Sequence, residues 1–302
     1  MRFVSINNDG KEQAAVLDKK WRCMTLPSIN EHFNKSWPSD LFELIQPGIF
    51  SAFQRWWGEQ PTEETDQVER IEYPEYRPLY RHPRKIWGIG LNYVDHASDL
   101  DEQAPQGEPA SFMKPDTTII GYGDRICLPH QSERTTGEAE LGIIIGKECK
   151  DVSVEEAEQV IAGYTTVIDM TAEDILKRNP RYLTRSKSFD TFFSFGPQLV
   201  TPNEIGDVGK LEVSTVLNGD VHRSNKVENM TFPPYHLVFF HSHVMTLKPG
   251  DIISTGTPGA IVLRDGDIIE CQIDGFPSLR NPVTDLKKQG KGGALYGSTA
   301  KG

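Results

Sequence analysis

One segment of the chain, TTGEAELGIIIG at residues 135–146, carries the clearest hydrophobic pattern. Read as a β-strand, it alternates its side chains between two faces, so Glu138 and Glu140 share one face. The continuous apolar run that follows is typical of a strand buried on both faces. Two carboxylates at the mouth of such a strand repel each other unless a cation lies between them. The pattern therefore indicates a cation site, although the spacing alone also fits two glutamates that face solvent.

The first part of the chain has a different pattern and is predicted to form a small α+β module over residues 1–80. Residues 1–18 predict a β-hairpin with Asp9-Gly10 at its turn. Residues 36–61 predict two short helices that are separated at Pro47-Gly48. A polar, proline-spaced stretch follows, and it places the domain boundary near residue 80.

The larger domain, residues 81–302, is predicted to be rich in β-structure. Residues 153–163 predict its clearest helix, because a Ser and a Glu three residues apart form a capping box and a glycine follows. Residues 164–170 predict a strand that ends close to Asp169. The glycine- and lysine-rich tail from about residue 288 is expected to be mobile.

The last third of the chain is predicted to be mostly β-structure. Two hairpins are expected, with Asn218-Gly219 and Asp265-Gly266 at their turns. The apolar segment 236–247 lies between them. On a strand, its His241 and His243 would share a face and could bind a metal. Because no third nitrogen or sulfur ligand is signalled, the pattern favours ordinary packing or hydrogen bonding for both.

Composition narrows the classes of protein that need to be considered. The chain has 302 residues, of which 37% are hydrophobic and 25% charged, as in an ordinary globular protein. Its net charge of −11 argues against nucleic acid or an anionic membrane surface as a partner. No apolar run approaches a membrane span, so no membrane insertion is expected, and the N-terminus lacks the apolar core of a signal peptide. The four cysteines form no CxxC pattern, which indicates reduced thiols and a cytoplasmic protein.

Two polar segments stand out against this background. Residues 94–111 are rich in Asp, Gly and Pro, and we expect them to form a loop that is mobile without ligand and closes over the site as a lid. Residues 171–192 are locally basic in an acidic chain, which is what an anionic substrate would need, although a solvated basic face is an equally good interpretation. The basic residues are Lys177, Arg178, Arg181, Arg185 and Lys187.

Seven segments of the chain, in order and at similar spacing, resemble the fumarylacetoacetate hydrolase family, including its acylpyruvate hydrolase and oxaloacetate decarboxylase-like members. The resemblance covers residues 84–284. It rests on GLNYVDHASD (90–99), FMKPDTTIIGYGD (112–124), GEAELGIIIG (137–146), GYTTVIDMTAED (163–174), KSFDTFFSFGP (187–197), LNGDV (217–221) and MTLKPGDIISTGTPG (245–259). It implies a β-rich α+β protein: a mixed β-roll or sandwich domain, joined here to the small N-terminal α+β module, and a homodimer.

The resemblance also implies a divalent metal centre. It identifies Glu138, Glu140 and Asp169 as the ligands, and three hard oxygen ligands suit Mg²⁺ or Mn²⁺. Lys187 matches the lysine that lies beside the metal in the family. Thr257, next to Gly256, matches the threonine that binds the substrate carboxylate.

The sequence departs from the family pattern at three positions. His96 matches the catalytic histidine of the lid, but Asp99 occupies the place of its usual glutamate partner, which shortens the reach by one methylene. Glu173 and Leu176 stand where the family often has an arginine and a glutamine that bind the substrate. Another cation must then bind the substrate, and Arg185, with Arg178 and Arg181, is a candidate.

The chemistry implied is cleavage of a C–C bond in a small anionic 2-oxo acid through a metal-stabilised enolate. Oxaloacetate decarboxylation and hydrolysis of an acylpyruvate share this enolate, so the motifs do not separate them. Isomerisation or decarboxylation of a hydroxy-dienedioate uses the same logic and is kept as an alternative. A binding or regulatory protein with vestigial activity is a further alternative, but it gives no reason for all three carboxylates and Lys187 to be present.

Overall fold

The computed structural model describes residues 1–94, 105 and 107–288. The lid prediction, with His96 and Asp99, and the mobile tail predicted from about residue 288 therefore fall largely or wholly outside the described residues. Within them, no helix combines the length and the apolar character that are needed to cross a membrane.

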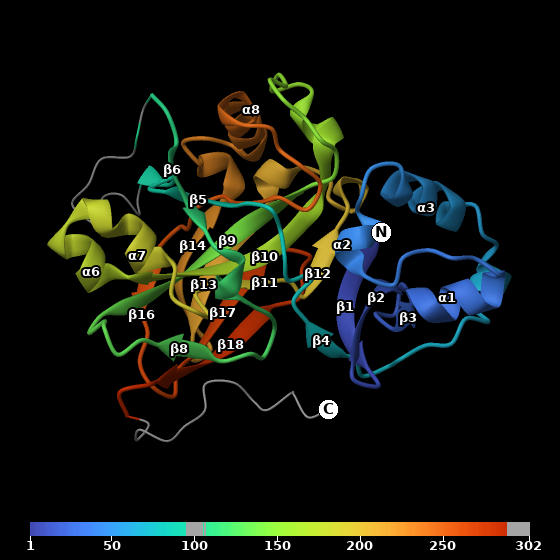
Figure 1. The fold of residues 1–302 in the computed structure, drawn as a ribbon, viewed down its shortest axis with the longest axis horizontal. Helices are drawn as coiled ribbons and strands as arrows, with labels where there is room; N and C mark the ends of the chain where they lie inside the picture. The colour runs from blue at the N-terminus through green and yellow to red at the C-terminus, as the bar shows by residue number, and fades with distance from the viewer. Residues whose placement is uncertain (95–104, 106, 289–302) are drawn as a thin grey trace.

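The described strands form one large mixed sheet and one smaller sheet (Figure 1). The main path of the large sheet runs, in spatial order, through β3 (Cys23–Thr25), β2 (Lys11–Leu17), β1 (Arg2–Asn8), β12 (Gln198–Val200), β10 (Ile161–Ala172), β9 (Thr135–Ile145), β15 (Ile252–Ser254), β5 (Ile86–Gly90) and β6 (Ala110–Lys114). Four strands pair beside this path: β4 (Glu75–Arg77), β7 (Ile119–Ile120), β11 (Phe193–Phe195) and β16 (Ala260–Val262). The smaller sheet runs through β14 (Asp220–Lys226), β13 (Glu212–Leu217), β17 (Ile268–Ile273), β18 (Leu279–Asp285) and β8 (Ile126–Leu128).

Helices are short and lie at the periphery of the sheets (Figure 1). The N-terminal region carries α1 (Leu26–Phe33), α2 (Leu41–Leu44), α3 (Ile49–Gly58) and α4 (Thr62–Thr65), and the larger region carries α6 (Glu173–Arg178), α7 (Leu183–Lys187) and α8 (Pro234–Val244). The β-rich α+β architecture predicted from the sequence is confirmed.

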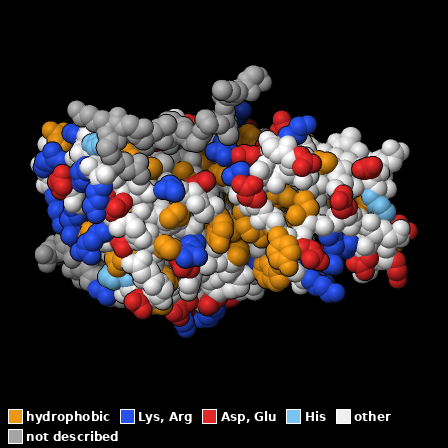
Figure 2. Space-filling model, turned by 90° about the horizontal axis from the view of Figure 1, so that it is seen from below, with side chains coloured by type: hydrophobic (Ala, Val, Ile, Leu, Met, Phe, Trp, Pro, Cys, Tyr) orange, Lys and Arg blue, Asp and Glu red, His pale blue; other side chains and the backbone are white. Residues whose placement is uncertain are grey.

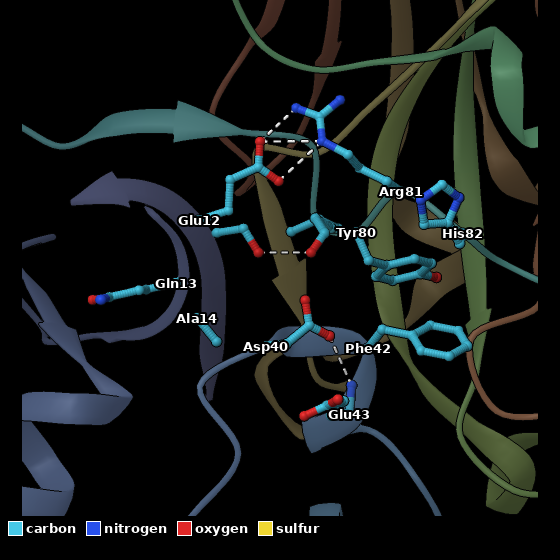
Figure 3. Close-up of a pocket in the computed structure, with 11 residues that line it drawn as sticks. Glu12, Gln13, Ala14, Asp40, Phe42, Glu43, Tyr80, Arg81 and His82 are labelled. Carbon is cyan, nitrogen blue, oxygen red and sulfur yellow. Dashed lines mark hydrogen bonds and ion pairs between the residues drawn. The ribbon is translucent and has the colours of Figure 1, made fainter. Parts of the chain in front are cut away.

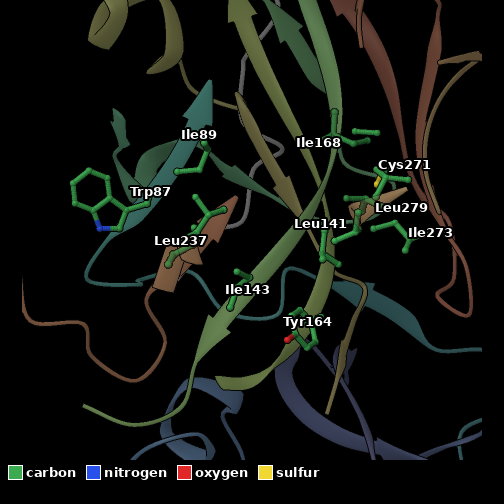
Figure 4. Packing of buried hydrophobic residues seen from close by; sticks show 14 of the residues in the cluster. Trp87, Ile89, Leu141, Ile143, Tyr164, Ile168, Leu237, Cys271, Ile273 and Leu279 are labelled. Carbon is green, nitrogen blue, oxygen red and sulfur yellow. The ribbon is translucent and has the colours of Figure 1, made fainter. Parts of the chain in front are cut away.

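Strand β9 divides the hydrophobic core, because its two faces meet different layers. Ala139, Leu141, Ile143 and Ile145 are fully buried in the core between the sheets, where Leu141 and Ile168 lie close to Cys271 and Leu279 (Figure 4). Ile144, on the other face, packs into a second core. The prediction that this strand is buried on both faces is therefore confirmed.

The second core joins the N-terminal region to the larger domain. Phe3 and Phe53 from the N-terminal elements share it with Val167 and Phe195. Strand β1 pairs antiparallel with β12, so the large sheet continues from one region into the other. The predicted hairpin is present, with β1 and β2 joined at Asp9-Gly10, and both turn residues have positive φ. Residues 1–80 thus extend the large sheet and share its packing.

Three predictions about secondary structure are wrong. The capping box of the predicted helix 153–163 does form, since Ser153 and Glu156 exchange two hydrogen bonds. It starts only a 3₁₀ turn over Ala157–Val160, and β10 begins at Ile161. The chain leaves the helical path because the apolar residues after the turn pair with β9, and this pairing outweighs local propensity.

The segment 236–247 is largely helix α8 and not a strand. The helix starts at Pro234, where proline fits the first turn, and buries Leu237, Val238 and His241 on one side. His241 Nδ1 lies 2.7 Å from the carbonyl of Leu237, and His243 Nδ1 lies 2.9 Å from that of Phe239. Ordinary packing and hydrogen bonding, which the sequence favoured for both histidines, are confirmed.

The two predicted C-terminal turns have different outcomes. β13 and β14 form the hairpin expected at Asn218-Gly219, and both residues have positive φ. At Asp265-Gly266 the hairpin is absent, because β16 pairs with β9 of the large sheet whereas β17 pairs with β13 and β18 of the smaller one. This turn therefore carries the chain from one sheet to the other.

Candidate active site

Strands β9 and β10 bring three acidic side chains to one point. Their antiparallel register places Asp169 opposite Glu138 and Val167 opposite Glu140, so the three carboxylates share a face of the sheet. One oxygen from each carboxylate lies within 4.8 Å of the other two. The exposed fractions are 8% for Glu138, 2% for Glu140 and 1% for Asp169. The prediction that the two glutamates share one face is confirmed, and Asp169 on the neighbouring strand β10 supplies the third carboxylate.

Two buried lysines hold this cluster together. Lys187, at the end of α7, places its Nζ 2.8 Å from Glu138 Oε2 and 2.6 Å from Asp169 Oδ2. Lys114, at the end of β6, places its Nζ 2.5 Å from Asp169 Oδ1. Lys187 lines the cavity described below and lies over the ring of Phe112, at 4.7 Å from its centroid. The sequence analysis identified Lys187 but missed Lys114, which lies in the motif FMKP and has no local pattern that marks it as buried.

Neutral donors fix the orientation of the two glutamates. Thr171 Oγ1 lies 3.1 Å from Glu138 Oε2. Glu140 Oε2 accepts hydrogen bonds from the Ser254 hydroxyl and, at 2.9 Å, from the backbone N–H of Gly256. Gly256 has φ +95°, a conformation that a side chain would strain. Such outer partners are what orient the ligands of a metal centre.

The charges in this cluster fit a divalent cation. When all three carboxylates are ionised, they face two ammonium groups, and one negative charge remains uncompensated in a buried site. Burying such a charge is costly unless a cation accompanies it. The donors are hard carboxylate oxygens, which suit Mg²⁺ or Mn²⁺ better than a soft metal. The residues present therefore fit the metal that the sequence predicted.

The pKa values in the cluster follow from burial and from the two lysines. Burial, with the nearby charges of Asp169 and Glu138, raises the pKa of Glu140 to about 8. Burial also acts to raise the pKa of Asp169, but the attraction of Lys114 and Lys187 outweighs it and lowers that pKa. Burial lowers the pKa of Lys114 to about 8, with Asp169 opposing the shift. For Lys187 the attraction of Asp169 and Glu138 outweighs burial and raises the pKa. Glu140 is therefore the carboxylate that holds a proton at neutral pH.

Metal binding is expected to release this proton. Below a pH of about 8, Mn²⁺ must displace a proton from Glu140, so the apparent affinity should rise about tenfold for each pH unit up to that point and level off above it. Calorimetric titrations in two buffers of different ionisation enthalpy measure the number of protons released, which should approach one at pH 7. An affinity for Mn²⁺ that stays constant from pH 6 to pH 8 would show that Glu140 holds no proton in the metal-free protein.

The cluster opens into a cavity of about 640 Å³. Its floor carries Glu138, Glu140 and Lys187, together with Thr257. Thr257 is 3% exposed, and its hydroxyl lies 3.2 Å from both the backbone N–H and the carbonyl of Gly259. The rest of the wall is mostly apolar and comes from β5, β6 and the α6–α7 segment.

The predicted arginines do not line this cavity. Arg185 donates to Gln131 at 2.8 Å, and Arg178 pairs with Asp174. Among the described lining residues, the basic segment contributes Lys187 and also Lys177, which the sequence analysis named as basic but did not assign to the site. We predicted that an arginine of this segment takes over the role of the family's substrate-binding arginine and glutamine. The described part of the cavity gives that prediction no support.

A second cavity, of about 250 Å³, lies in the N-terminal region beside β2 and α2 (Figure 3). Three of its charged side chains form interactions that stabilise local structure. Arg81 forms a bidentate pair with Glu12, and Asp40 caps α2 by accepting the N–H of Glu43 (Figure 3). These interactions hold local structure, so the acidic cluster on β9 and β10 remains the candidate active site.

Comparison with known proteins agrees with this geometry. Residues 85–284 match the fumarylacetoacetate (FAA) hydrolase C-terminal family, and the chain belongs to that family. The mitochondrial oxaloacetate tautomerase of Xenopus laevis is 36% identical over 211 residues, which cover 67% of this chain and 66% of that protein.

Solved structures share the whole fold. A maleylpyruvate hydrolase from Sphingobium sp. SYK-6, solved in complex with manganese(II) and pyruvate, has a TM-score of 0.77 and 26% identity over 94% of this chain and 99% of that one. A 5-carboxymethyl-2-hydroxymuconate delta-isomerase from Mycobacterium smegmatis has a TM-score of 0.72 and 28% identity over 96% of this chain and 100% of that one. The relatives are thus named as hydrolases, tautomerases and isomerases.

Proposed function

We propose that this protein is a divalent-metal-dependent enzyme that acts on small 2-oxo acids by way of their enolates. One observation carries the proposal: three buried carboxylates converge with Lys187, and two of the carboxylates and this lysine line a cavity that can admit a small molecule. A buried cluster beside a cavity, in which the pKa of Glu140 is raised and that of Asp169 is lowered, is typical of an active site. The manganese in a structural neighbour supports the choice of Mg²⁺ or Mn²⁺.

The roles of the residues follow from their positions. Glu138, Glu140 and Asp169 would hold the cation, which supplies Lewis-acid chemistry at the 2-oxo group when bound. Lys187 faces the cavity, so its ammonium can donate a hydrogen bond to the oxygen on which negative charge develops. Thr257 lines the same cavity, and its hydroxyl can donate to the substrate carboxylate. The proton transfers are assigned to His96 on the sequence resemblance.

The reaction that we propose is cleavage of a C–C bond, either decarboxylation of oxaloacetate or hydrolysis of an acylpyruvate. Keto–enol isomerisation is the second candidate, and a specific observation favours it: the Xenopus laevis relative is named an oxaloacetate tautomerase. Both need the same enolate, so both draw on the same carboxylates and on Lys187.

A turnover panel separates these reactions. The Mn²⁺-loaded protein is incubated with oxaloacetate, acetylpyruvate, fumarylpyruvate and a hydroxy-dienedioate, and products are followed by ultraviolet absorbance and by detection of pyruvate. We expect turnover of at least one compound, and its loss on chelation of the metal. Loss of the enol signal without release of pyruvate would identify isomerisation. Absence of turnover on the whole panel would contradict the proposed function.

A further inference from the structure

The cavity contains a second positive position, away from the metal-binding cluster. Among the described lining residues, the cations are Lys187 and Lys177. Lys187 is buried and engaged with two carboxylates of the cluster. Lys177 lies on α6, and its side chain is 63% exposed. Lys and Arg side chains gather at one end of the molecule (Figure 2), and both α6 and α7 have basic last turns.

Lys177 has capacity for another anion. Its Nζ lies 2.7 Å from Glu173 Oε1, while the other oxygen of this carboxylate pairs with Arg134 Nε. One carboxylate is therefore shared by two cations, which leaves one positive charge in excess at this wall. An ammonium group has three N–H donors, so the bond to Glu173 leaves donors available.

The wall beside Lys177 is apolar. The lining residues that provide it are Leu91, Phe112, Leu176, Pro180 and Leu183. Such a surface fits a hydrocarbon segment and cannot solvate a charge. The cavity therefore has one positive position at the metal-binding cluster, an apolar wall, and another positive position at α6.

We propose that Lys177 determines the preference of this enzyme among 2-oxo acids, by binding a distal carboxylate at the α6 wall. This inference rests on the proposed function, since it takes the metal-binding cluster as the site of the 2-oxo acid. Charge supports it: a divalent cation would leave one positive charge at the cluster, and the Arg134–Glu173–Lys177 group carries another. These two positive charges together match a ligand that carries two negative charges.

The test measures binding without turnover. Two ligands of equal chain length are compared by calorimetry on the Mn²⁺-loaded full chain: 2-oxoglutarate, which ends in a carboxylate, and 2-oxovalerate, which ends in a methyl group. The wild-type protein should bind 2-oxoglutarate about tenfold more tightly, the difference expected for one charge-assisted contact. In Lys177→Met the two affinities should become equal within twofold, and Lys177→Arg should restore most of the preference.

Arg178 provides a matched control. It is the next residue on α6, its side chain is 53% exposed, and it pairs with Asp174 outside the described cavity lining. Arg178→Met should therefore keep the preference for 2-oxoglutarate. The proposal is overturned if Lys177→Met keeps that preference, if Arg178→Met loses it equally, or if the wild-type protein does not distinguish the two ligands. Because no turnover is required, this outcome is separate from failure of the turnover panel.

Discussion

Replacement of Glu138 by alanine is expected to abolish tight Mn²⁺ binding and, with it, turnover. Glu138 supplies one of three carboxylates at the cluster and is the one held by both Lys187 and Thr171. Changing an outer partner of a metal typically costs about 10–100-fold in affinity, so loss of a direct ligand should exceed that range. Calorimetric titration with Mn²⁺ measures the effect directly.

Glu133 gives the control for this experiment. It precedes β9, its side chain is 80% exposed, and it pairs with Lys287 at 3.3 Å. Glu133→Ala removes the same charge from the chain and should leave the Kd for Mn²⁺ within twofold of the wild-type value. If Glu138→Ala binds Mn²⁺ as tightly as Glu133→Ala does, the three carboxylates are not the metal centre.

Replacement of Lys187 by methionine should destabilise the metal-free protein strongly. The ammonium of Lys187 is buried between Glu138 and Asp169, and its removal leaves two buried carboxylates with less compensation. Breaking a buried ion pair in this way costs about 3–5 kcal/mol. Mn²⁺ supplies positive charge at the same point, so its addition should raise the melting temperature of the variant more than that of the wild type. Thermal unfolding with and without Mn²⁺ measures both effects.

An exposed ion pair offers the comparison. Lys210 pairs with Glu228 at 2.5 Å, but its side chain is 64% exposed, so Lys210→Met should leave the melting temperature close to that of the wild type. Equal melting temperatures for Lys187→Met and Lys210→Met would mean that Lys187 does not compensate the carboxylates. If Mn²⁺ raises the melting temperature of Lys187→Met no more than that of the wild type, Lys187 likewise does not compensate the carboxylates.

Local alternation predicted that Glu138 and Glu140 share a face, but it did not decide whether that face binds a cation or meets solvent. A strand with a period of two fixes Glu138 and Glu140 on one face, whatever lies around it. Asp169 and Lys187 needed the family resemblance, because their approach depends on the pairing of β10 with β9 and on the position of α7. Lys114 was missed because its burial depends on packing across the sheet, which the motif FMKP does not encode.

Two of the three wrong predictions share a cause. Residues 153–163 do form a capping box, but the apolar residues that follow it belong to strand β10, which pairs with β9. The turn at Asp265-Gly266 is real too, yet its flanking strands join different sheets. Local signals marked the turns correctly, and long-range pairing decided what the turns connect. The homodimer, the boundary at residue 80, the cytoplasmic location and the role of His96 with Asp99 stay predictions.

Formation of an enolate at the metal-binding cluster is the central claim, and hydrogen exchange tests it most directly. The Mg²⁺-loaded protein is mixed with oxaloacetate or acetylpyruvate in deuterium oxide, and loss of the proton signal at the carbon next to the 2-oxo group is followed by nuclear magnetic resonance. We predict exchange well above the rate with Mg²⁺ alone, and a return to that rate in Glu138→Ala. Exchange at the protein-free rate with every 2-oxo acid, or equal acceleration by Glu138→Ala, would contradict the claim.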